Sequence, residues 1–169
     1  MNTSHVVLVM GPSGSGKSTL GAALAKELRA AFIDADDFCP PAARTKMSAG
    51  IPLDDSDRAP WLHLLNARLH AHSEPLIVLA CSAHKESYRR LLFARLSFPP
   101  HIIYLSGPPE LIRQRMVQRI HPFMPPALLD SQLALMEKPA RCYCPDITRP
   151  IDEIVQDAAN FVLYQIRTT

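Results

Sequence analysis

Long apolar runs, a large net charge and paired cysteine motifs are all missing from this sequence. Among its 169 residues no apolar stretch approaches the roughly 20 residues of a membrane-spanning helix, so we expect no membrane partner. The segment Met1–His5 has neither a basic region nor a cleavable apolar stretch, so we expect no signal peptide and a cytoplasmic location. The 18 basic and 16 acidic residues leave a net charge of +2, which is too balanced for a nucleic-acid partner.

The four cysteines follow no C-x-x-C spacing and join no histidine cluster of the kind that binds zinc. Cys142 and Cys144 flank Tyr143, so in an extended segment both thiols would lie on one side. We expect Cys39, Cys81, Cys142 and Cys144 to be buried, unpaired thiols in a reducing compartment. A metal or redox pair is the alternative.

Glycine is scarce as well, and three of the six glycines gather in one loop. This loop, Gly11–Thr19, follows the apolar run Val6–Met10 and precedes the helical pattern of Leu20–Leu28, and it matches the phosphate-binding spacing G-x-x-x-x-G-K-[ST]. Its N–H groups and the following helix N-terminus would bind the phosphates of ATP. Lys17 would reach the β- and γ-phosphates, and Ser18 would offer its hydroxyl to Mg²⁺. The residues expected at the nucleotide are Gly11, Pro12, Ser13, Gly14, Ser15, Gly16, Lys17, Ser18 and Thr19. The alternative is a flexible turn that matches by chance.

Apolar segments alternate with helical patterns along the chain, which favours an α/β domain with a parallel sheet. The chain length suits a single domain that spans residues 1–169. An amphipathic pattern over Ile151–Ile166 predicts a closing helix. The expected strands are Val6–Met10, Ala31–Asp34, Leu76–Cys81 and His101–Leu105, with Arg141–Cys144 as a poor fifth strand.

Three aspartates lie at the carboxyl end of the second expected strand. Asp34 ends that strand, and Asp36 and Asp37 come directly after it. Ligands of parallel α/β sheets bind beyond the carboxyl ends of the strands, so we expect a substrate and a metal here. The alternative is an acidic turn that caps the next helix.

Between residues 39 and 57, approximately, the composition shifts to proline, alanine, serine and aspartate. Pro40, Pro41 and Pro52 exclude one long helix, so we expect a small insertion that forms a substrate cap. Trp61, which begins the next helical pattern, is expected to be a core anchor rather than a ligand platform. Arg58, just before it, is a candidate for binding an anion.

Two pairs of basic residues have helical spacing. Lys85 and Arg89 follow the third expected strand, so they share a helix face and could bind a carboxylate or a phosphate. Arg115 and Arg119 precede a proline-broken loop, as in the lid of small phosphotransferases, and we place this lid at residues 115–135, approximately. Such arginines stabilise charge on a transferring phosphoryl group. For both pairs the alternative is a solvated charged face.

Several of these segments together resemble the gluconokinases, which are carbohydrate kinases of the P-loop type. The resemblance covers nearly the whole chain and rests on Met10–Thr19, Asp34–Phe38, Lys46–Asp55, Asp57–Leu62, Ala80–Ala83, Tyr88–Arg89 and Phe123–Gln132. It implies a P-loop kinase fold, with a parallel five-stranded sheet, a substrate cap and an arginine-bearing lid. It also implies transfer of the γ-phosphoryl group of ATP to the 6-hydroxyl of D-gluconate, which gives 6-phosphogluconate for the pentose phosphate route.

On this hypothesis each candidate residue has a role. Lys17 binds the phosphates, Ser18 binds Mg²⁺ and Asp34 holds a metal-bound water. Asp36 orients the attacking hydroxyl and accepts its proton, as in related small kinases. The candidates for binding the substrate are Asp36, Arg58, Lys85, Arg89 and Gln132, and the three cations among them would bind the carboxylate. Arg115 and Arg119 would close over the γ-phosphate.

The chain departs from the family pattern at four positions near the expected sugar-acid pocket. Ala35 stands where glycine is usual, Cys39 where histidine is usual, and Arg44 near a usual asparagine. His84 precedes Lys85, where the family usually has leucine. Two alternatives therefore stay open: a kinase for another small acceptor, such as shikimate or a nucleoside monophosphate, and a nucleotide-binding module without transfer activity. The resemblance also leaves a homodimer open, because bacterial relatives are often dimers.

Overall fold

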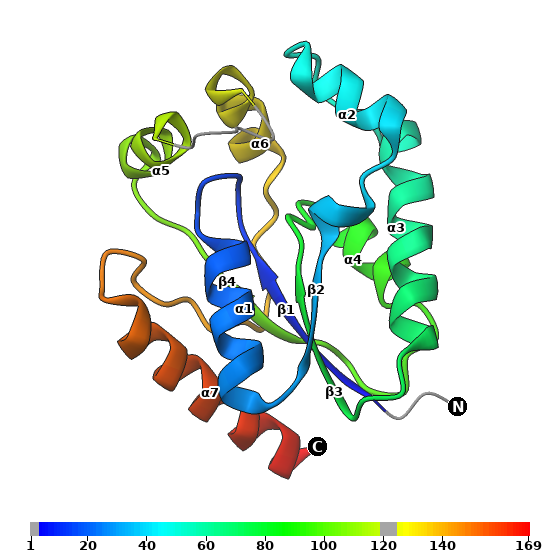
Figure 1. The fold of residues 1–169 in the computed structure, drawn as a ribbon, viewed down its shortest axis with the longest axis vertical. Helices are drawn as coiled ribbons and strands as arrows, with labels where there is room; N and C mark the ends of the chain where they lie inside the picture. The colour runs from blue at the N-terminus through cyan, green and yellow to red at the C-terminus, as the bar shows by residue number, and fades with distance from the viewer. Residues whose placement is uncertain (1–3, 119–124) are drawn as a thin grey trace.

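Four parallel strands form the sheet at the centre of the structure, a computed structural model that describes residues 4–118 and 125–169 (Figure 1). The strands lie in the order β2-β3-β1-β4, and every neighbouring pair is parallel. They are β1 His5–Met10, β2 Ala31–Asp34, β3 Leu76–Ala80 and β4 His101–Tyr104. All four carboxyl ends therefore meet at one edge of the sheet, and the expected α/β class is confirmed.

The sheet has four strands rather than five, because the segment expected as the fifth strand makes only isolated bridges to the β4 side of the sheet. The N–H of Tyr143 donates to the carbonyl of Ile102 (2.9 Å), and the carbonyl of Tyr143 accepts from the N–H of Tyr104 (2.8 Å). Pro145 has no N–H to donate, so the pairing is interrupted there before the second bridge, between Ser106 and Asp146. The outer edge of β4 is thus covered without a regular strand.

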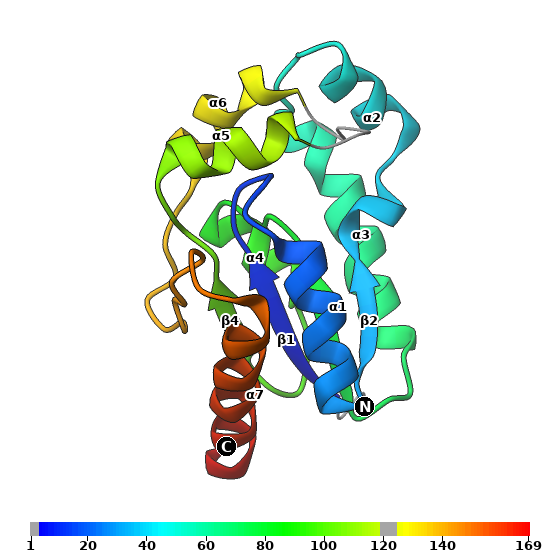
Figure 2. The ribbon, with the colours of Figure 1, turned by 60° about the vertical axis from the view of Figure 1, so that its left-hand side comes forward.

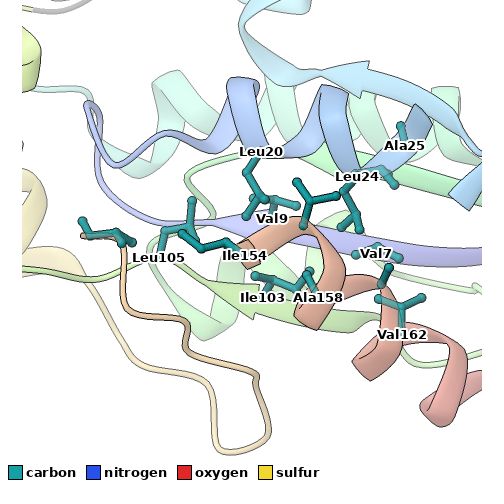
Figure 3. Packing of buried hydrophobic residues seen from close by; sticks show 14 of the residues in the cluster. Val7, Val9, Leu20, Leu24, Ala25, Ile103, Leu105, Ile154, Ala158 and Val162 are labelled. Atoms are coloured by element: carbon teal, nitrogen blue, oxygen red, sulfur yellow. The ribbon is translucent and has the colours of Figure 1, made fainter. Parts of the chain in front are cut away.

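Helices cover both faces of the sheet (Figures 1 and 2). The helices α1 Lys17–Leu28 and α7 Ile151–Thr168 pack on one face, and α3 Asp55–Ala71 and α4 Glu86–Leu92 pack on the other. Because side chains alternate along a strand, β1 contributes Val7 and Val9 to the first face and Leu8 to the second. Figure 3 shows the first of these cores, in which β1 meets Leu20 and Leu24 of α1 and Ile154, Ala158 and Val162 of α7. Within the described ranges, no helix is both long and apolar enough to cross a lipid bilayer.

Two helical units stand above the carboxyl ends of the strands (Figure 2). The segment expected as the cap contains α2 Pro41–Ser48, which follows the short helix η1 Ala35–Phe38. The segment expected as the lid contains the end of α5 Pro109–Val117, η2 Pro126–Leu128 and α6 Leu129–Leu135. In the cap, Met47 packs with Cys39 and Leu53 in a small core, and Lys46 forms a 2.8 Å salt bridge with Asp57 of α3. The cap therefore has its own apolar centre and a polar link to α3.

The four cysteines are free thiols, in two different settings. Cys39 and Cys81 are buried, as expected, whereas Cys142 is only half-buried and Cys144 is exposed, so the expectation of burial is wrong for Cys144 and only partly met for Cys142. The Sγ atoms of Cys142 and Cys144 lie 3.4 Å apart, on one side of the segment, as the alternation predicts. Burial raises the pKa of the Cys142 thiol to about 11, so this thiol is protonated near neutral pH.

Two histidines meet at the end of the sheet opposite the cap and lid. His5 Nδ1 lies 3.1 Å from His101 Nε2, and the His5 ring stacks on Phe98. Burial lowers the pKa of both imidazoles, and the charge of His5 lowers the pKa of His101 further. The folded protein therefore resists protonation of these rings at pH values at which an unfolded chain accepts the protons.

We expect the free energy of unfolding to fall as the pH is lowered from about 7.5 to about 5.5. In the unfolded chain the two histidines bind protons once the pH falls below their ordinary pKa of about 6.5, whereas the folded pair does not. The contribution of the neutral pair to the free energy of unfolding is therefore fully present above about pH 6.5 and is lost as the pH falls further. Urea titrations at the two pH values measure the loss. The variant His5→Leu, which keeps an apolar contact with Phe98, should lose less stability over this range. An equal loss in both proteins would contradict the prediction.

Candidate active site

The loop between β1 and α1 has the backbone of a phosphate cradle. Gly11, Gly14 and Gly16 have positive φ angles of 152°, 82° and 99°. A side chain at Gly14 would also collide with α5, because its Cβ would lie 2.5 Å from Met116 Cγ. The hydroxyl of Ser15 is buried and has no hydrogen-bond partner among the described residues. A buried, unpaired hydroxyl inside such a loop fits an oxygen of a bound phosphate.

A cavity of about 720 Å³, including its open mouth, lies between this loop, the cap and the lid helix α6. We call it the central cavity. Its walls are Ser13, Lys17 and Ser18 of the loop region, Ala35 and Asp36 of η1, Met47 of α2, Arg58, Trp61, Leu62 and Leu65 of α3, Cys81, Ser82, Ala83 and His84 after β3, Tyr88 of α4 and Gln132 of α6. The structure thus brings candidate phosphate-binding and substrate-binding residues together in one space.

Lys17 and Ser18 form the start of α1 and one wall of the central cavity. Lys17 Nζ donates a hydrogen bond to the carbonyl of Pro12 at 3.1 Å, so the ammonium is held over the loop. The N-terminus of α1 adds unpaired N–H groups and the positive end of the helix dipole at the same place. This wall therefore presents a concentration of positive charge to an anionic ligand.

Asp34 and Asp36 lie at the end of β2 and have different neighbours. Asp34 Oδ1 accepts a hydrogen bond from the N–H of Asp36 at 3.0 Å and caps η1, which was the alternative expected from the sequence. The carbonyl of Asp36 accepts from Arg44 Nη2 at 3.0 Å, and the Asp36 side chain lines the central cavity. Together with the Ser18 hydroxyl, these carboxylates are hard oxygen donors of the kind that Mg²⁺ prefers. Within residues 4–118 and 125–169, no three acidic, histidine or cysteine side chains are grouped so that they could hold a metal ion by themselves.

Arg58 brings a guanidinium into the central cavity from the first turns of α3. Its Nη2 donates to the carbonyl of Leu53 at 3.4 Å, and its Cζ lies 5.6 Å from the centre of the Tyr88 ring. Its Nε is buried and has no hydrogen-bond partner in the described part of the chain. A guanidinium with such long contacts can still donate strongly to a carboxylate.

The other two predicted cations do not line the central cavity. Lys85 forms a 2.9 Å salt bridge with Asp55. The Arg89 side chain is only 4% exposed, and its Nη2 pairs with Glu86 at 2.8 Å. Its Nη1 donates at 2.8 Å to the carbonyl of Ala83, which has a left-handed φ of 42°. Arg89 therefore stabilises the turn after β3.

Gln132 connects the lid helix to the phosphate loop. Its Oε1 accepts a hydrogen bond from the N–H of Ser13 at 2.8 Å, and this contact is buried. Of the two lid arginines, Arg115 donates from Nη2 to the carbonyl of Ile147 at 2.8 Å. Arg119 lies outside the described residues. The structure therefore places Arg115 against the segment before α7 rather than in the central cavity.

Sequence reasoning missed a second cavity along the other flank of the phosphate loop, which we call the lateral cavity. Its walls are Ser15, Gly16, Thr19, Leu20, Leu105, Arg115, Ile147, Arg149, Ile151 and Ile154. Arg149 is held there by salt bridges to Glu153 (2.9 Å) and Asp157 (2.8 Å). Apolar walls and two planar guanidinium groups suit a nucleotide base. No motif marks this cavity, because distant segments of the chain form it.

Sequence reasoning also missed Tyr88 as a residue of the central cavity, whereas His84, which was expected near the sugar-acid pocket, does line it. His84 is 1% exposed, and burial, together with the positive charge of Arg58, lowers its pKa to about 3. Trp61 was expected to be a core anchor, and its Nε1 donates to the carbonyl of Ala35 at 2.8 Å. The Trp61 side chain also lines the central cavity, so Trp61 both anchors α3 to η1 and forms part of the cavity wall.

Known proteins resemble this chain along most of its length. A family model described as an AAA domain matches residues 6–139. A probable gluconokinase of Mus musculus is 43% identical over 159 residues, which cover 83% of this chain and 86% of that protein. The thermosensitive gluconokinase of Escherichia coli (strain K12) is 44% identical over 136 residues, with coverages of 78% and 71%. The crystal structure of a gluconokinase from Sinorhizobium meliloti 1021 matches with a TM-score of 0.86 at 36% identity, covering 99% of this chain and 95% of that one. The chain therefore belongs to the gluconokinase family.

Proposed function

We propose that this chain transfers the γ-phosphoryl group of ATP to the 6-hydroxyl of D-gluconate and releases 6-phosphogluconate and ADP. The observation that carries the proposal is a single cavity in which Lys17 and Ser18 share the walls with Asp36 and Arg58. One side of this space suits phosphates, and the other offers a carboxylate for proton transfer and a guanidinium for an anionic acceptor. The relatives named as gluconokinases support the choice of acceptor.

Phosphoryl transfer depends on positioning and charge neutralisation more than on covalent help from the protein. The loop N–H groups and Lys17 hold the phosphates. Asp36 orients the 6-hydroxyl and accepts its proton as the bond from this oxygen to the γ-phosphorus forms and the bond from the γ-phosphorus to the β–γ bridging oxygen breaks, which releases ADP. Ser18 would bind Mg²⁺ directly, and Asp34 would hold it through a water molecule. When bound, the ion offsets the negative charge of the β- and γ-phosphates.

The lid and the lateral cavity complete the proposed nucleotide site. When the lid closes, Arg115 would have to leave the carbonyl of Ile147 to reach the γ-phosphate together with Arg119, and this closure would exclude water and limit hydrolysis of ATP. The lateral cavity would hold the adenine base, beside the loop that holds the phosphates.

Arg58 is the residue that we propose for the carboxylate of gluconate. Lys85 and Arg89, the other candidates from the sequence, have carboxylate or carbonyl partners of their own. Of the four departures from the family pattern, only Ala35 and His84 line the central cavity. The substrate pocket is thus less altered than the sequence alone indicates.

The substitution Arg58→Gln should raise the KM for gluconate by about 10–100-fold, because a hydrogen bond to a charged group contributes about 1.5–3 kcal/mol. The KM for ATP should change little. The substitution Arg89→Gln should instead lower the melting temperature, because it leaves the carbonyl of Ala83 without its buried donor. Initial rates and thermal melts of both variants test this contrast. A raised KM for gluconate in Arg89→Gln alone would contradict it.

An assay that couples ADP release to NADH oxidation, with gluconate, shikimate and nucleoside monophosphates as separate acceptors, tests the proposed function. We expect gluconate-dependent turnover, with 6-phosphogluconate identified by ³¹P NMR. Turnover of a different acceptor alone would replace gluconate as the substrate. ATP binding without turnover of any acceptor would favour a nucleotide-binding module.

The same proposal has consequences for the location, the partners and the oligomeric state of the protein. We infer a cytoplasmic enzyme of one domain, residues 1–169, that acts on a small sugar acid without nucleic-acid or membrane partners. We also propose a homodimer, the assembly that the resemblance to the gluconokinases leaves open. Light scattering would distinguish a dimer from the 18.8 kDa monomer.

A further inference from the structure

His84 has a fixed position in the wall of the central cavity, after the end of β3. Its side chain is 1% exposed. Its carbonyl accepts hydrogen bonds from the N–H of Glu137 (2.8 Å) and from Arg89 Nη1 (3.3 Å). The backbone is thus held both by α4 and by the segment after α6, so the imidazole is presented to the cavity from a rigid base.

The contact with Arg58 determines which ring nitrogen of His84 carries the proton. Arg58 Nη1 lies 3.5 Å from His84 Nδ1, at the long end of the hydrogen-bond range. A guanidinium can only donate, so Nδ1 accepts and the proton of the neutral ring lies on Nε2. Burial, and after it the positive charge of Arg58, lowers the pKa of His84 to about 3, so the ring is neutral near pH 7.

This arrangement leaves buried donors in the cavity wall. His84 Nε2 has no hydrogen-bond partner in the described part of the chain, and neither has Arg58 Nε. The Gln132 side chain is near enough to raise the pKa of His84, against the effect of burial. Buried donors without partners are rare in folded proteins. Two of them in the wall of one cavity indicate a polar ligand.

We propose that His84 determines specificity in the acceptor site: its Nε2–H donates to a hydroxyl oxygen of the bound sugar acid, while its Nδ1 orients Arg58 toward the carboxylate. This inference rests on the proposed function, because it takes a polyhydroxy carboxylate as the acceptor. Such a molecule carries a carboxylate and hydroxyls on one short chain, so both contacts form together. An acceptor without the hydroxyl would leave the donor buried and unpaired, so the site rejects it.

Three substitutions separate the two contacts of the ring. His84→Leu fills the space and removes both nitrogens. His84→Gln can place an amide N–H near the position of Nε2, and His84→Asn can place an amide oxygen near the position of Nδ1. The exposed His63 of α3 provides the matched control His63→Leu.

Initial rates with gluconate and ATP, together with thermal melts, test the proposal. We expect His84→Leu to lower kcat/KM for gluconate by about 10–100-fold, with the KM for ATP unchanged. His84→Gln should recover more of the loss than His84→Asn, and His63→Leu should match the wild type. Among monodeoxy analogues of gluconate, one should be a poorer substrate than gluconate for the wild type but not for His84→Leu. Recovery by His84→Asn alone, or an equal penalty for every analogue in both proteins, would overturn the hydroxyl contact.

A measurement on the wild-type protein covers the case in which the variants fail to fold. In a ¹⁵N–¹H spectrum of the histidine rings, His84 should show the Nε2–H tautomer, and its Nε2 signal should shift when gluconate is added. An Nδ1–H tautomer, or no shift at saturating gluconate, would overturn the proposal. The two hypotheses also fail differently: a wild type without gluconate turnover refutes the proposed function, whereas turnover that is unchanged in His84→Leu refutes only the role of His84.

Discussion

Replacing Lys17 with alanine should abolish phosphoryl transfer and leave the fold intact. The Lys17 ammonium is held over the phosphate loop by the carbonyl of Pro12, in the wall of the central cavity. Phosphoryl transfer depends on neutralising the charge of the β- and γ-phosphates, so no neutral side chain can replace the Lys17 ammonium. We expect kcat/KM to fall by at least about 100-fold, the effect of removing one electrostatic donor from a transition state. The coupled ADP assay measures the loss.

The matched control is Lys26→Ala, which removes the same charge from the exposed last turn of the same helix. Both variants should melt within about 2–4 °C of the wild type, because this corresponds to about 1 kcal/mol for a chain of this size. Wild-type turnover by Lys17→Ala would contradict the assignment of the phosphate loop. A large drop in melting temperature would show that Lys17 is needed for the fold.

The substitution Asp36→Asn should lower kcat by about 100–10,000-fold, the usual contribution of a positioned general base. The amide has the same shape and keeps the backbone contacts of Asp36 with Asp34 and Arg44. It cannot accept the proton of the attacking hydroxyl. The KM for ATP should change little, because the loop on the other wall binds the phosphates. Initial rates with both substrates varied measure the two effects separately.

Asp37→Asn is the control for this experiment, because Asp37 is the exposed neighbour on the same short helix η1. It removes the same charge at nearly the same distance from β2. Equal losses of kcat in the two variants would indicate a general effect of charge. An unchanged kcat in Asp36→Asn would remove Asp36 from the proton transfer.

The sheet and the phosphate loop could be predicted because their signals are local. Val6–Met10 is apolar throughout, as a strand covered on both faces must be, and the loop that follows has glycines where the backbone takes positive φ angles. The acidic turn after β2 could also be placed, because Asp34 ends a recognisable strand. The fifth strand could not, because Pro145 interrupts the pairing between the bridge at Tyr143 and the bridge at Asp146, so no regular strand forms.

The functional side chains were harder to predict, because their roles depend on contacts between distant segments. Helical spacing puts Lys85 and Arg89 on one face, but it does not reveal that the carbonyl of Ala83 turns back toward Arg89. Likewise His84 could be recognised as unusual in the sequence. Its neighbour Arg58 lies 26 positions away, on helix α3, and only the folded chain brings the two together.

The hydrogen bond between the N–H of Ser13 and Gln132 joins the phosphate loop to the lid helix α6. The two residues are 119 positions apart, and the contact between them is buried. On the proposed function, a triphosphate on the loop and a sugar acid beside α6 would both act on this one contact. If both substrates favour the same docked position of α6, linkage requires each to tighten the binding of the other by the same factor. One amide side chain would then connect the donor site with the acceptor site.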